Sequence, residues 1–328
     1  MSFAIFENYL RNLIPSNLSE EKARFFADQN YNPQLAYSVP ISFEHPPYKG
    51  SIQITHLAKA KSILEDVSAQ FGTEEKYVIQ TEGELLTEED VLSQITEYLI
   101  ENNVLNIVKL VFTTDAPSRT AFEKLETGYE LRIRKPVEYR KFALRGMLHH
   151  EIGTHLFRWR NQEILAQKLD PKLTLNDFRE TEEGLASFHS LLENKAPYLW
   201  TPALYYYTVA MAAQKSFAEL FLDLEKFVAN PARRWELTMR AKRGLADTSQ
   251  PGGFFKDQTY LTGAIEVAKW ITMNPTMVRL LYLGKIALSD IKLIHEQGKE
   301  PTFVPIFLTD EKKYLDRMKE IFTFNHLL

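Results

Sequence analysis

Two histidines and a glutamate between Leu148 and His155 constrain the fold of this chain more than any other feature. His150, Glu151 and His155 form the pattern HExxxH, which has one residue more than the HExxH pattern of zinc hydrolases. In HExxH the histidines share one helix face, so both reach one zinc ion while the glutamate activates the metal-bound water. Five residues at about 100° each leave the two histidines roughly 140° apart on a regular α-helix. The pattern therefore indicates either a chance pair of helical histidines or a metal site on a distorted helix.

One widened helical turn would remove this difficulty. A π-turn, with an i→i+5 hydrogen bond, brings His150 and His155 to nearly the same face, and such turns tend to occur at functional sites. Gly153 stands where the distortion would fall. Glycine tolerates unusual backbone angles and weakens a regular helix by roughly 1 kcal/mol. We therefore expect a π-turn here, with Gly153 supplying the backbone freedom.

The third metal ligand is expected on the next helix. The segment TEEGLA, residues 181–186, opens an apolar helical run a little under thirty residues after the histidine pair. In one class of zinc hydrolase the third ligand is a glutamate on that helix, commonly just before a glycine, and Glu183 fits this role. Glu182 is the alternative, because spacing does not resolve an offset of one residue. Without the histidines, Glu183 would be interpreted as a helix-start carboxylate stabilised by the macrodipole.

Four motifs in a fixed order give the chain a family resemblance. They are HHEIGTH at 149–155, TEEGLA at 181–186, RAKRG at 240–244 and GGFFKDQTYLTG at 252–263. Together they resemble the domain shared by microtubule-associated tyrosine carboxypeptidases and bacterial QEGLA-motif proteins. The similarity is clearest over residues 125–290, and YNPQ at 31–34 resembles an Asn-x-Pro element of the family.

The resemblance implies a zincin-like metallopeptidase with Zn²⁺ as its cofactor. His150, His155 and Glu183 would bind the zinc, and Glu151 would be the general base. Bacterial relatives commonly carry Gln where this chain has Glu182, which implies that this residue is not catalytic. The resemblance does not establish the substrate, tubulin included.

Composition excludes several classes of protein. Of 328 residues, 45% are hydrophobic and 25% charged, which is typical of a globular chain with two domains or one large one. A net charge of -4 argues against a nucleic-acid or anionic-membrane partner. Without cysteine, zinc would be held by His and carboxylate, which suits a catalytic site. The N-terminal segment lacks a signal-peptide pattern and no apolar stretch approaches the roughly twenty residues of a membrane span, so we expect a cytoplasmic protein.

The hydrophobic pattern predicts an α+β fold, mainly helical, with a small twisted sheet backing the active-site helix. Pro40, Pro46 and Pro47 predict a boundary between an N-terminal helical arm, 1–45, and a zincin-like catalytic domain, 46–328. This domain would divide into a sheet part, 46–136, and a helical part with the zinc site, 137–328. Helices are expected at 4–14, 19–29 with Ser19 as N-cap, 56–71, 87–102, 137–160 bounded by Pro136 and Asn161, 181–194, 201–213, 214–229, 231–243, 259–271, 275–283 and 287–297, and strands at 77–81, 104–113 and 129–134.

Further residues are candidates for the surroundings of the metal. The oxyanion of a tetrahedral intermediate needs a donor besides the metal, and Tyr260 could supply a phenol, although a structural hydrogen bond explains it equally well. His189 follows Glu183 by six residues and would point away from zinc on a regular helix. The run Tyr205 to Tyr207 is expected in the core rather than as a substrate platform.

A terminal carboxylate is best recognised by arginine, whose planar guanidinium donates two parallel hydrogen bonds. Arg240 and Arg243 are the leading candidates, because a spacing of three places them on one side of a helix that Gly244 would cap. Stabilisation of the helix dipole is the structural alternative. Lys256, beside Asp257 in the glycine-rich turn, is a further carboxylate partner.

These residues predict a zinc-dependent metallopeptidase in which Glu151 assists the attack of zinc-bound water. The family resemblance implies a carboxypeptidase that removes a C-terminal residue. Its partner would be a peptide or protein C-terminus; the sequence does not predict the oligomeric state, the side chain preferred, or exopeptidase over endopeptidase action. A zinc-binding regulatory protein without peptidase activity is the alternative, although a structural site has no need of a base such as Glu151. A helical scaffold with incidental histidines is the third possibility.

Overall fold

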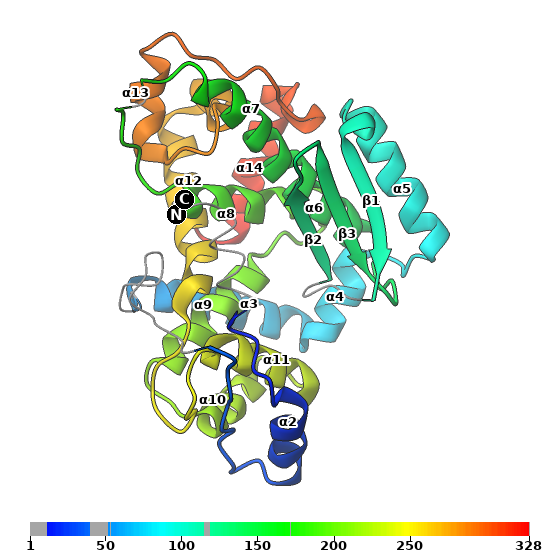
Figure 1. The fold of residues 1–328 in the computed structure, drawn as a ribbon, viewed down its shortest axis with the longest axis vertical. Coiled ribbons are helices and arrows are strands. Elements are labelled where there is room, and N and C mark those ends of the chain that lie inside the picture. The colour runs from blue at the N-terminus through cyan, green and yellow to red at the C-terminus, as the bar shows by residue number, and fades with distance from the viewer. Residues whose placement is uncertain (1–11, 40–51, 53, 115–118, 171, 328) are drawn as a thin grey trace. The chain divides into compact units, whose positions relative to one another are not determined.

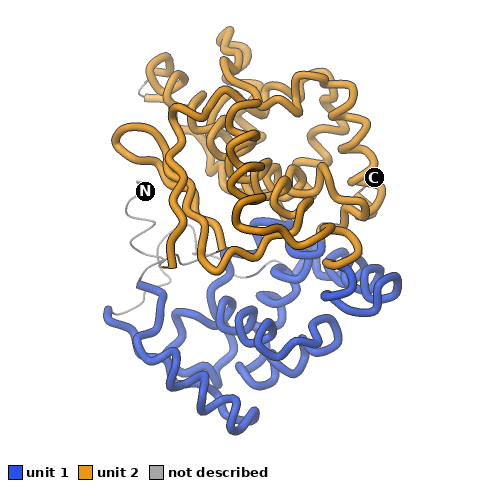
Figure 2. The backbone as a smooth tube through the Cα atoms, turned by 90° about the vertical axis from the view of Figure 1, so that its right-hand side faces the viewer, with its two compact units in different colours: residues 1–77, 200–261 blue, residues 78–199, 262–328 orange. Residues whose placement is uncertain are grey.

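The computed structural model describes residues 12–39, 52, 54–114, 119–170 and 172–327 (Figure 1). The packing divides the chain into two compact units, unit 1 with Met1–Tyr77 and Trp200–Leu261, and unit 2 with Val78–Leu199 and Thr262–Leu328 (Figure 2). The predicted boundary near residue 45 stays a prediction, because residues 40–51 and 53 lie outside the described part. None of the described helices combines the length and apolar character needed to cross a membrane.

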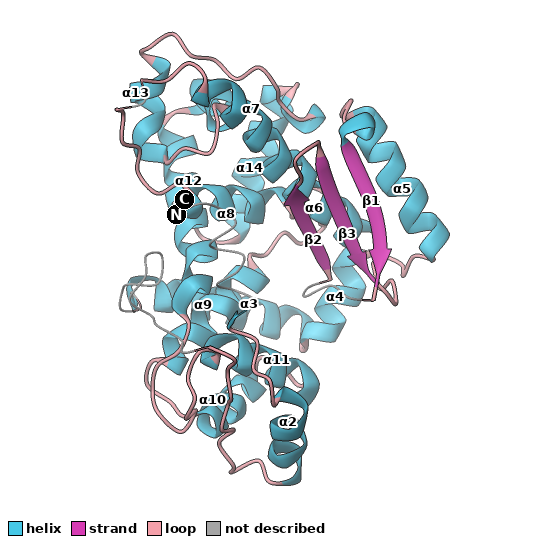
Figure 3. Cartoon of the chain, viewed as in Figure 1, coloured by secondary structure: helices cyan, strands magenta, loops and turns pink. Residues whose placement is uncertain are grey.

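Unit 2 contains a small mixed sheet with β3 in the middle (Figure 3). β3 runs parallel to β1 and antiparallel to β2, and its Leu131 pairs with Leu110 on one side and Phe122 on the other. Leu131 and Ile133 are fully buried, as the alternating pattern of a half-buried strand requires. The strands are β1 (Val108–Thr113), β2 (Thr120–Lys124) and β3 (Tyr129–Arg134).

The rest of unit 2 is helical, so the expected α+β class with a small sheet is confirmed. Thr87 and Asp90 form a capping box at the start of α5, which begins the helix predicted at 87–102. The helices are α5 (Glu88–Glu101), α6 (Lys141–His150), a π-helix (Glu151–Leu156), α7 (Phe157–Ala166), α8 (Arg179–His189), a 3-10 helix (Pro275–Tyr282), α13 (Ile291–His295) and α14 (Glu311–Phe324).

Unit 1 is helical, and α3 packs along the almost fully buried α9. An aromatic cluster around Phe25, Phe217, Phe221 and Trp235 forms a core, with ring centroids 4.8 to 5.2 Å from that of Phe25. The helices are α2 (Leu18–Ala27), α3 (Leu57–Phe71), α9 (Trp200–Ala212), α10 (Phe217–Asp223) and α11 (Pro231–Lys242), and α12 (Gln258–Met273) continues into unit 2.

Several predicted elements are corrected. The strand expected at 77–81 is part of helix α4 (Glu74–Glu82), because Thr73 accepts a hydrogen bond from the Lys76 amide and two glutamates occupy the first turn. The helix expected at 137–160 is α6, the π-helix and α7, and it continues past Asn161, whose side chain bonds the backbone of residues 302 and 303. The cap of α2 is Asn17 rather than Ser19. The helix expected at 4–14 lies largely outside the described residues.

Candidate metal centre

The π-turn predicted from the histidine spacing is present. The amide of Phe157 donates to the carbonyl of Ile152, five residues earlier, at the end of the π-helix. The widened turn brings the rings of His150 and His155 together, with centroids 4.8 Å apart. A regular α-helix would have kept them on different faces.

Gly153 lies within the π-helix, as predicted, but the reason predicted for a glycine at this position is wrong. Its φ does not lie in the left-handed region, so backbone freedom is not what the position requires. A Cβ here would lie 2.6 Å from Cε1 of Phe307 and 2.8 Å from the hydroxyl of Tyr98. Glycine is required because neighbouring side chains approach the π-helix closely.

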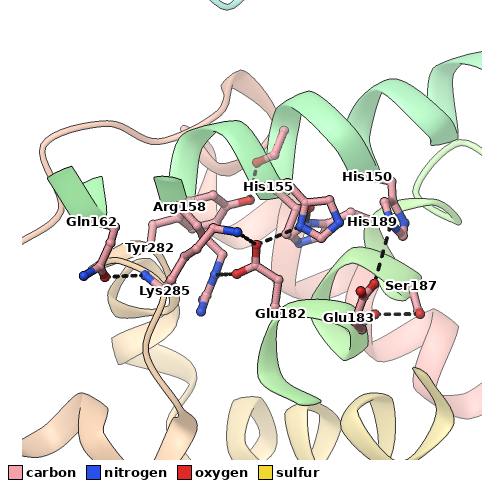
Figure 4. A network of polar contacts seen from close by, with 12 residues as sticks. His150, His155, Arg158, Gln162, Glu182, Glu183, Ser187, His189, Tyr282 and Lys285 are labelled. Carbon is pink, nitrogen blue, oxygen red and sulfur yellow. Dashed lines mark hydrogen bonds and ion pairs between the residues drawn. The ribbon is translucent and has the colours of Figure 1, made fainter. Parts of the chain in front are cut away.

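Glu183 on α8 completes a group of three possible ligands (Figure 4). Its Oε2 lies 3.9 Å from Nε2 of His150, and one ligand atom from each of His150, His155 and Glu183 lies within 4.8 Å of the others. This is the one cluster of its kind in the described part of the chain.

Two glycines allow the helices of the site to approach one another. A Cβ on Gly146 of α6 would lie 2.2 Å from the carbonyl oxygen of Ser190 at the end of α8. A Cβ on Gly184 would lie 2.1 Å from the backbone of Gly263 on α12. The glycine of the TEEGLA motif is therefore a close helix contact that places its neighbour Glu183.

Hydrogen bonds fix the tautomers of both histidines. Ser190 Oγ donates to the carbonyl of Ala186, 3.0 Å away, so it accepts from Nδ1 of His150 at 3.1 Å. Nδ1 of His155 donates to Oε1 of Glu182 at 2.8 Å. Both imidazoles therefore carry their proton on Nδ1 and keep the Nε2 lone pair for a metal ion.

The electrostatics differ between the two histidines. Burial lowers the pKa of His150 to about 4, so this ring is neutral at physiological pH and can coordinate. Burial alone would lower the pKa of His155, but the hydrogen bond to Glu182 and the surrounding carboxylate charges together raise that pKa above 6.5, so a metal ion would have to displace the Nε2 proton wherever this ring is protonated. The charge of half-buried Glu151 raises the pKa of both histidines.

The structure assigns Glu182 to a different role from Glu183. Its Oε1 also lies 3.0 Å from Nζ of Lys285, and its Oε2 accepts from Nε of Arg158 at 2.7 Å. Burial raises its pKa, but Lys285, Arg158 and His155 more than offset this and hold the pKa well below 4.5. Both oxygens of Glu182 are engaged and Oε1 orients His155, whereas Glu183 is the member of the acidic pair that lies in the group of possible ligands.

His189 does not face the ligand cluster. Its Nδ1 is 2.6 Å from the hydroxyl of Thr154 and its Nε2 is 2.8 Å from that of Tyr314, so both nitrogens are used. Burial lowers its pKa well below 6.5 and the ring is neutral. His189 reaches the π-helix through Thr154 and is not a ligand.

Arg240 and Arg243, the predicted carboxylate partners, belong to unit 1. Nε and Nη2 of Arg240 both bond the buried carboxylate of Asp257, and its guanidinium lies 4.5 Å from the ring centre of Tyr205. Helix α11 ends at Lys242, so Arg243 follows it in extended backbone and the expected shared helix side is wrong. Gly244, with a φ of 92°, ends the helix as predicted.

The other predicted residues of unit 1 have structural neighbours. The ring of Tyr260 packs edge-on against that of Tyr205, with centroids 5.8 Å apart. Tyr206 and Tyr207 are buried, as predicted for the tyrosine run. Lys256 lies in a 3-10 helix, Phe255–Asp257. The substrate and oxyanion roles of Arg240, Arg243, Lys256 and Tyr260 stay predictions.

Sequence reasoning missed the residues that support the ligands. Arg158 follows His155 by three residues, a helical spacing that could have suggested it. Ser190, Tyr282 and Lys285 carry no local signal, because tertiary packing alone brings them to the site.

Comparison with known proteins agrees with the motifs. A family model described as microtubule-associated tyrosine carboxypeptidase matches residues 28–326. Microtubule-associated tyrosine carboxypeptidase 1 is 34% identical over 325 residues in Mus musculus and 36% over 327 in Homo sapiens, in each case 96% of this chain and 68% of the relative. A protein named "Putative tyrosine carboxypeptidase MATCAP2" from Mus musculus is 37% identical over 320 residues. The match covers 95% of this chain but only 61% of the length of that relative. The chain belongs to the microtubule-associated tyrosine carboxypeptidase family.

Proposed function

We propose that this chain is a zinc-dependent carboxypeptidase of zincin-like type. The observation that carries the proposal is the group of His150, His155 and Glu183, with ligand atoms within 4.8 Å of one another; Glu151 follows His150 directly in the sequence. Two imidazoles and one carboxylate are the donor set of many catalytic zinc sites, and both rings keep Nε2 available. A bound zinc ion would supply Lewis acidity, which polarises a peptide carbonyl and lowers the pKa of water.

Glu151 would act as general base and then as general acid. Its carboxylate would accept a proton from the attacking water and deliver it to the amine nitrogen that leaves. Ser190 and Glu182 would hold the two imidazoles in place throughout.

The names of the relatives support removal of a C-terminal residue, with tyrosine as the first residue to test. The substrate would be a peptide or protein C-terminus, and the description "microtubule-associated" is compatible with the cytoplasmic location predicted from the sequence. Arg243, Lys256 and Arg240 are the proposed partners of the terminal carboxylate, and Tyr260 the proposed oxyanion donor. Arg243 and Arg240 are to be mutated separately, because Arg240 also holds Asp257 with two hydrogen bonds and its variant would lose them.

The test of the mechanism is Glu151→Gln with a peptide that ends in tyrosine. The amide cannot accept a proton, so kcat should fall by several orders of magnitude while zinc content and fold persist. Glu163→Gln, on α7 and paired with Lys124, is the matched control and should keep its rate. A rate for Glu151→Gln within about tenfold of wild type, a barrier change of only about 1.4 kcal/mol, rules out the general-base role.

The direction of attack has a separate test. Amidation of the peptide C-terminus removes a charge-assisted contact that is worth roughly 1.5 to 3 kcal/mol, so cleavage should slow at least tenfold. Arg243→Ala should abolish the difference between the two peptides. Equal cleavage of both by the wild type would indicate an endopeptidase, and zinc binding without any cleavage would favour the regulatory alternative.

A further inference from the structure

One carbonyl of the π-helix is passed over by the amide of Phe157. The amide of Phe157 donates to the carbonyls of Ile152 and Thr154, which lie on either side of Gly153. The carbonyl of Gly153 instead accepts a hydrogen bond of 2.7 Å from the hydroxyl of Tyr282. Tyr282 is the last residue of the 3-10 helix Pro275–Tyr282 and is 1% exposed, so no bulk water replaces this donor.

A second set of buried groups holds the same turn from Thr154. The Thr154 hydroxyl donates to the carbonyl of His149, 2.9 Å away and five residues earlier. The same oxygen therefore accepts from Nδ1 of His189 at 2.6 Å. Nε2 of this neutral ring then accepts from the hydroxyl of Tyr314 at 2.8 Å.

We propose that Tyr282, together with the Tyr314–His189–Thr154 chain, positions the metal centre by holding the π-turn between His150 and His155. The proposal rests on the proposed zinc site. Histidines five residues apart share one face only while the turn stays widened. Tyr282 donates to the carbonyl that the Phe157 amide passes over, and the side chain of Thr154 bridges back to His149, an interval of five residues that overlaps the one between the two histidines.

A purely structural role makes a different prediction. These hydroxyls lie in the core of unit 2, so their loss would lower stability in either case. A structural role leaves the affinity for zinc and the ligand geometry unchanged in the folded variant. A positioning role changes both, because removal of groups behind metal ligands typically costs 10-fold to 100-fold in affinity.

The test is Tyr282→Phe, which removes one hydroxyl and keeps the ring. Zinc affinity, measured by competition with a chelator, should fall at least tenfold. The visible spectrum of the Co²⁺-substituted protein should lose the intensity of a tetrahedral site. Tyr207→Phe is the matched control: Tyr207 is buried in unit 1, its hydroxyl donates to Asp223, and its loss should leave affinity and spectrum as in the wild type.

A second pair of variants decides the matter if Tyr282→Phe does not fold. Thr154→Val keeps the shape of the side chain and removes the hydroxyl, so zinc should bind more weakly. Thr154→Ser restores the hydroxyl and should restore the affinity. Wild-type affinity and an unchanged Co²⁺ spectrum in folded Tyr282→Phe or Thr154→Val overturn the proposal. A wild-type protein that binds no zinc overturns the proposed function instead.

Discussion

Replacing Glu182 by Gln tests the charge network behind His155. The substitution keeps the size of the side chain and leaves an amide oxygen that can still accept from Nδ1 of His155. It removes the negative charge that Lys285 and Arg158 share at 3.0 and 2.7 Å. Two cations are then left without their buried counter-charge.

The expected cost is about 3 kcal/mol of unfolding free energy. Removing one partner of a buried ion pair typically costs about 3 to 5 kcal/mol. The lower value applies because Arg158 still donates to the carbonyls of Leu281 and Ile286, and Lys285 is 13% exposed.

Urea unfolding of the metal-free protein, followed by circular dichroism, measures this cost without a contribution from zinc. Adding Lys285→Met to Glu182→Gln removes one stranded cation and should recover at least about 1 kcal/mol. Glu180→Gln, exposed on the same helix, is the control and should change stability by less than about 0.5 kcal/mol. A loss below about 1 kcal/mol for Glu182→Gln, with no recovery from the second change, refutes the network.

The contribution of Glu182 to the free energy of unfolding depends on pH in a defined direction. The pKa of Glu182 is held below its ordinary value of 4.5 in the folded protein, so the carboxylate contributes stability above pH 4.5 and loses it as the pH falls through the folded pKa. The stability difference between wild type and Glu182→Gln should therefore shrink as the pH falls below 4.5. It should also shrink as the pH rises through the pKa of His155, which Glu182 helps to raise above 6.5. A difference that grows as the pH falls below 4.5 contradicts the assignment.

Two further predictions concern helix packing and the metal. Gly184→Ala should destabilise by about 3 kcal/mol and weaken zinc binding, because its Cβ would meet the backbone of Gly263; wild-type stability in urea unfolding contradicts the close contact. Zinc at 100 times its dissociation constant should add about 2.7 kcal/mol of stability to the wild type and none to Glu183→Gln, seen as a rise in Tm; an equal rise in both proteins excludes Glu183 as a ligand.

The sequence was most informative where metal-ligand chemistry limits how far apart in the sequence two ligand residues can stand. The separation of His150 and His155 required a π-turn, because two imidazoles cannot share an ion otherwise, and the turn is present. The glycine after Glu183 favoured this member of the acidic pair, and Glu183 is the one that lies in the group of possible ligands. Strand β3 was also predicted within its observed bounds, because its alternation is regular.

The remaining parts depend on tertiary contacts that no local pattern records. The β-branched and aromatic residues of segment 77–81 suggested a strand, but a cap at Thr73 begins a helix there. Gly153 was assigned to backbone freedom, whereas Phe307 and Tyr98 determine its size. Lys285 stands over a hundred residues from Glu182 in the sequence, so its charge could be placed at the site only by the fold.

The most direct test of the metal centre is the zinc content of the purified wild-type protein and of His155→Ala, measured by inductively coupled plasma mass spectrometry. His150, His155 and Glu183 are predicted to hold one ion per chain. The wild type should contain close to one zinc, and His155→Ala should lose most of it while it keeps its helical circular dichroism. Full zinc occupancy in His155→Ala, or a folded wild type that takes up no zinc, contradicts the metal centre.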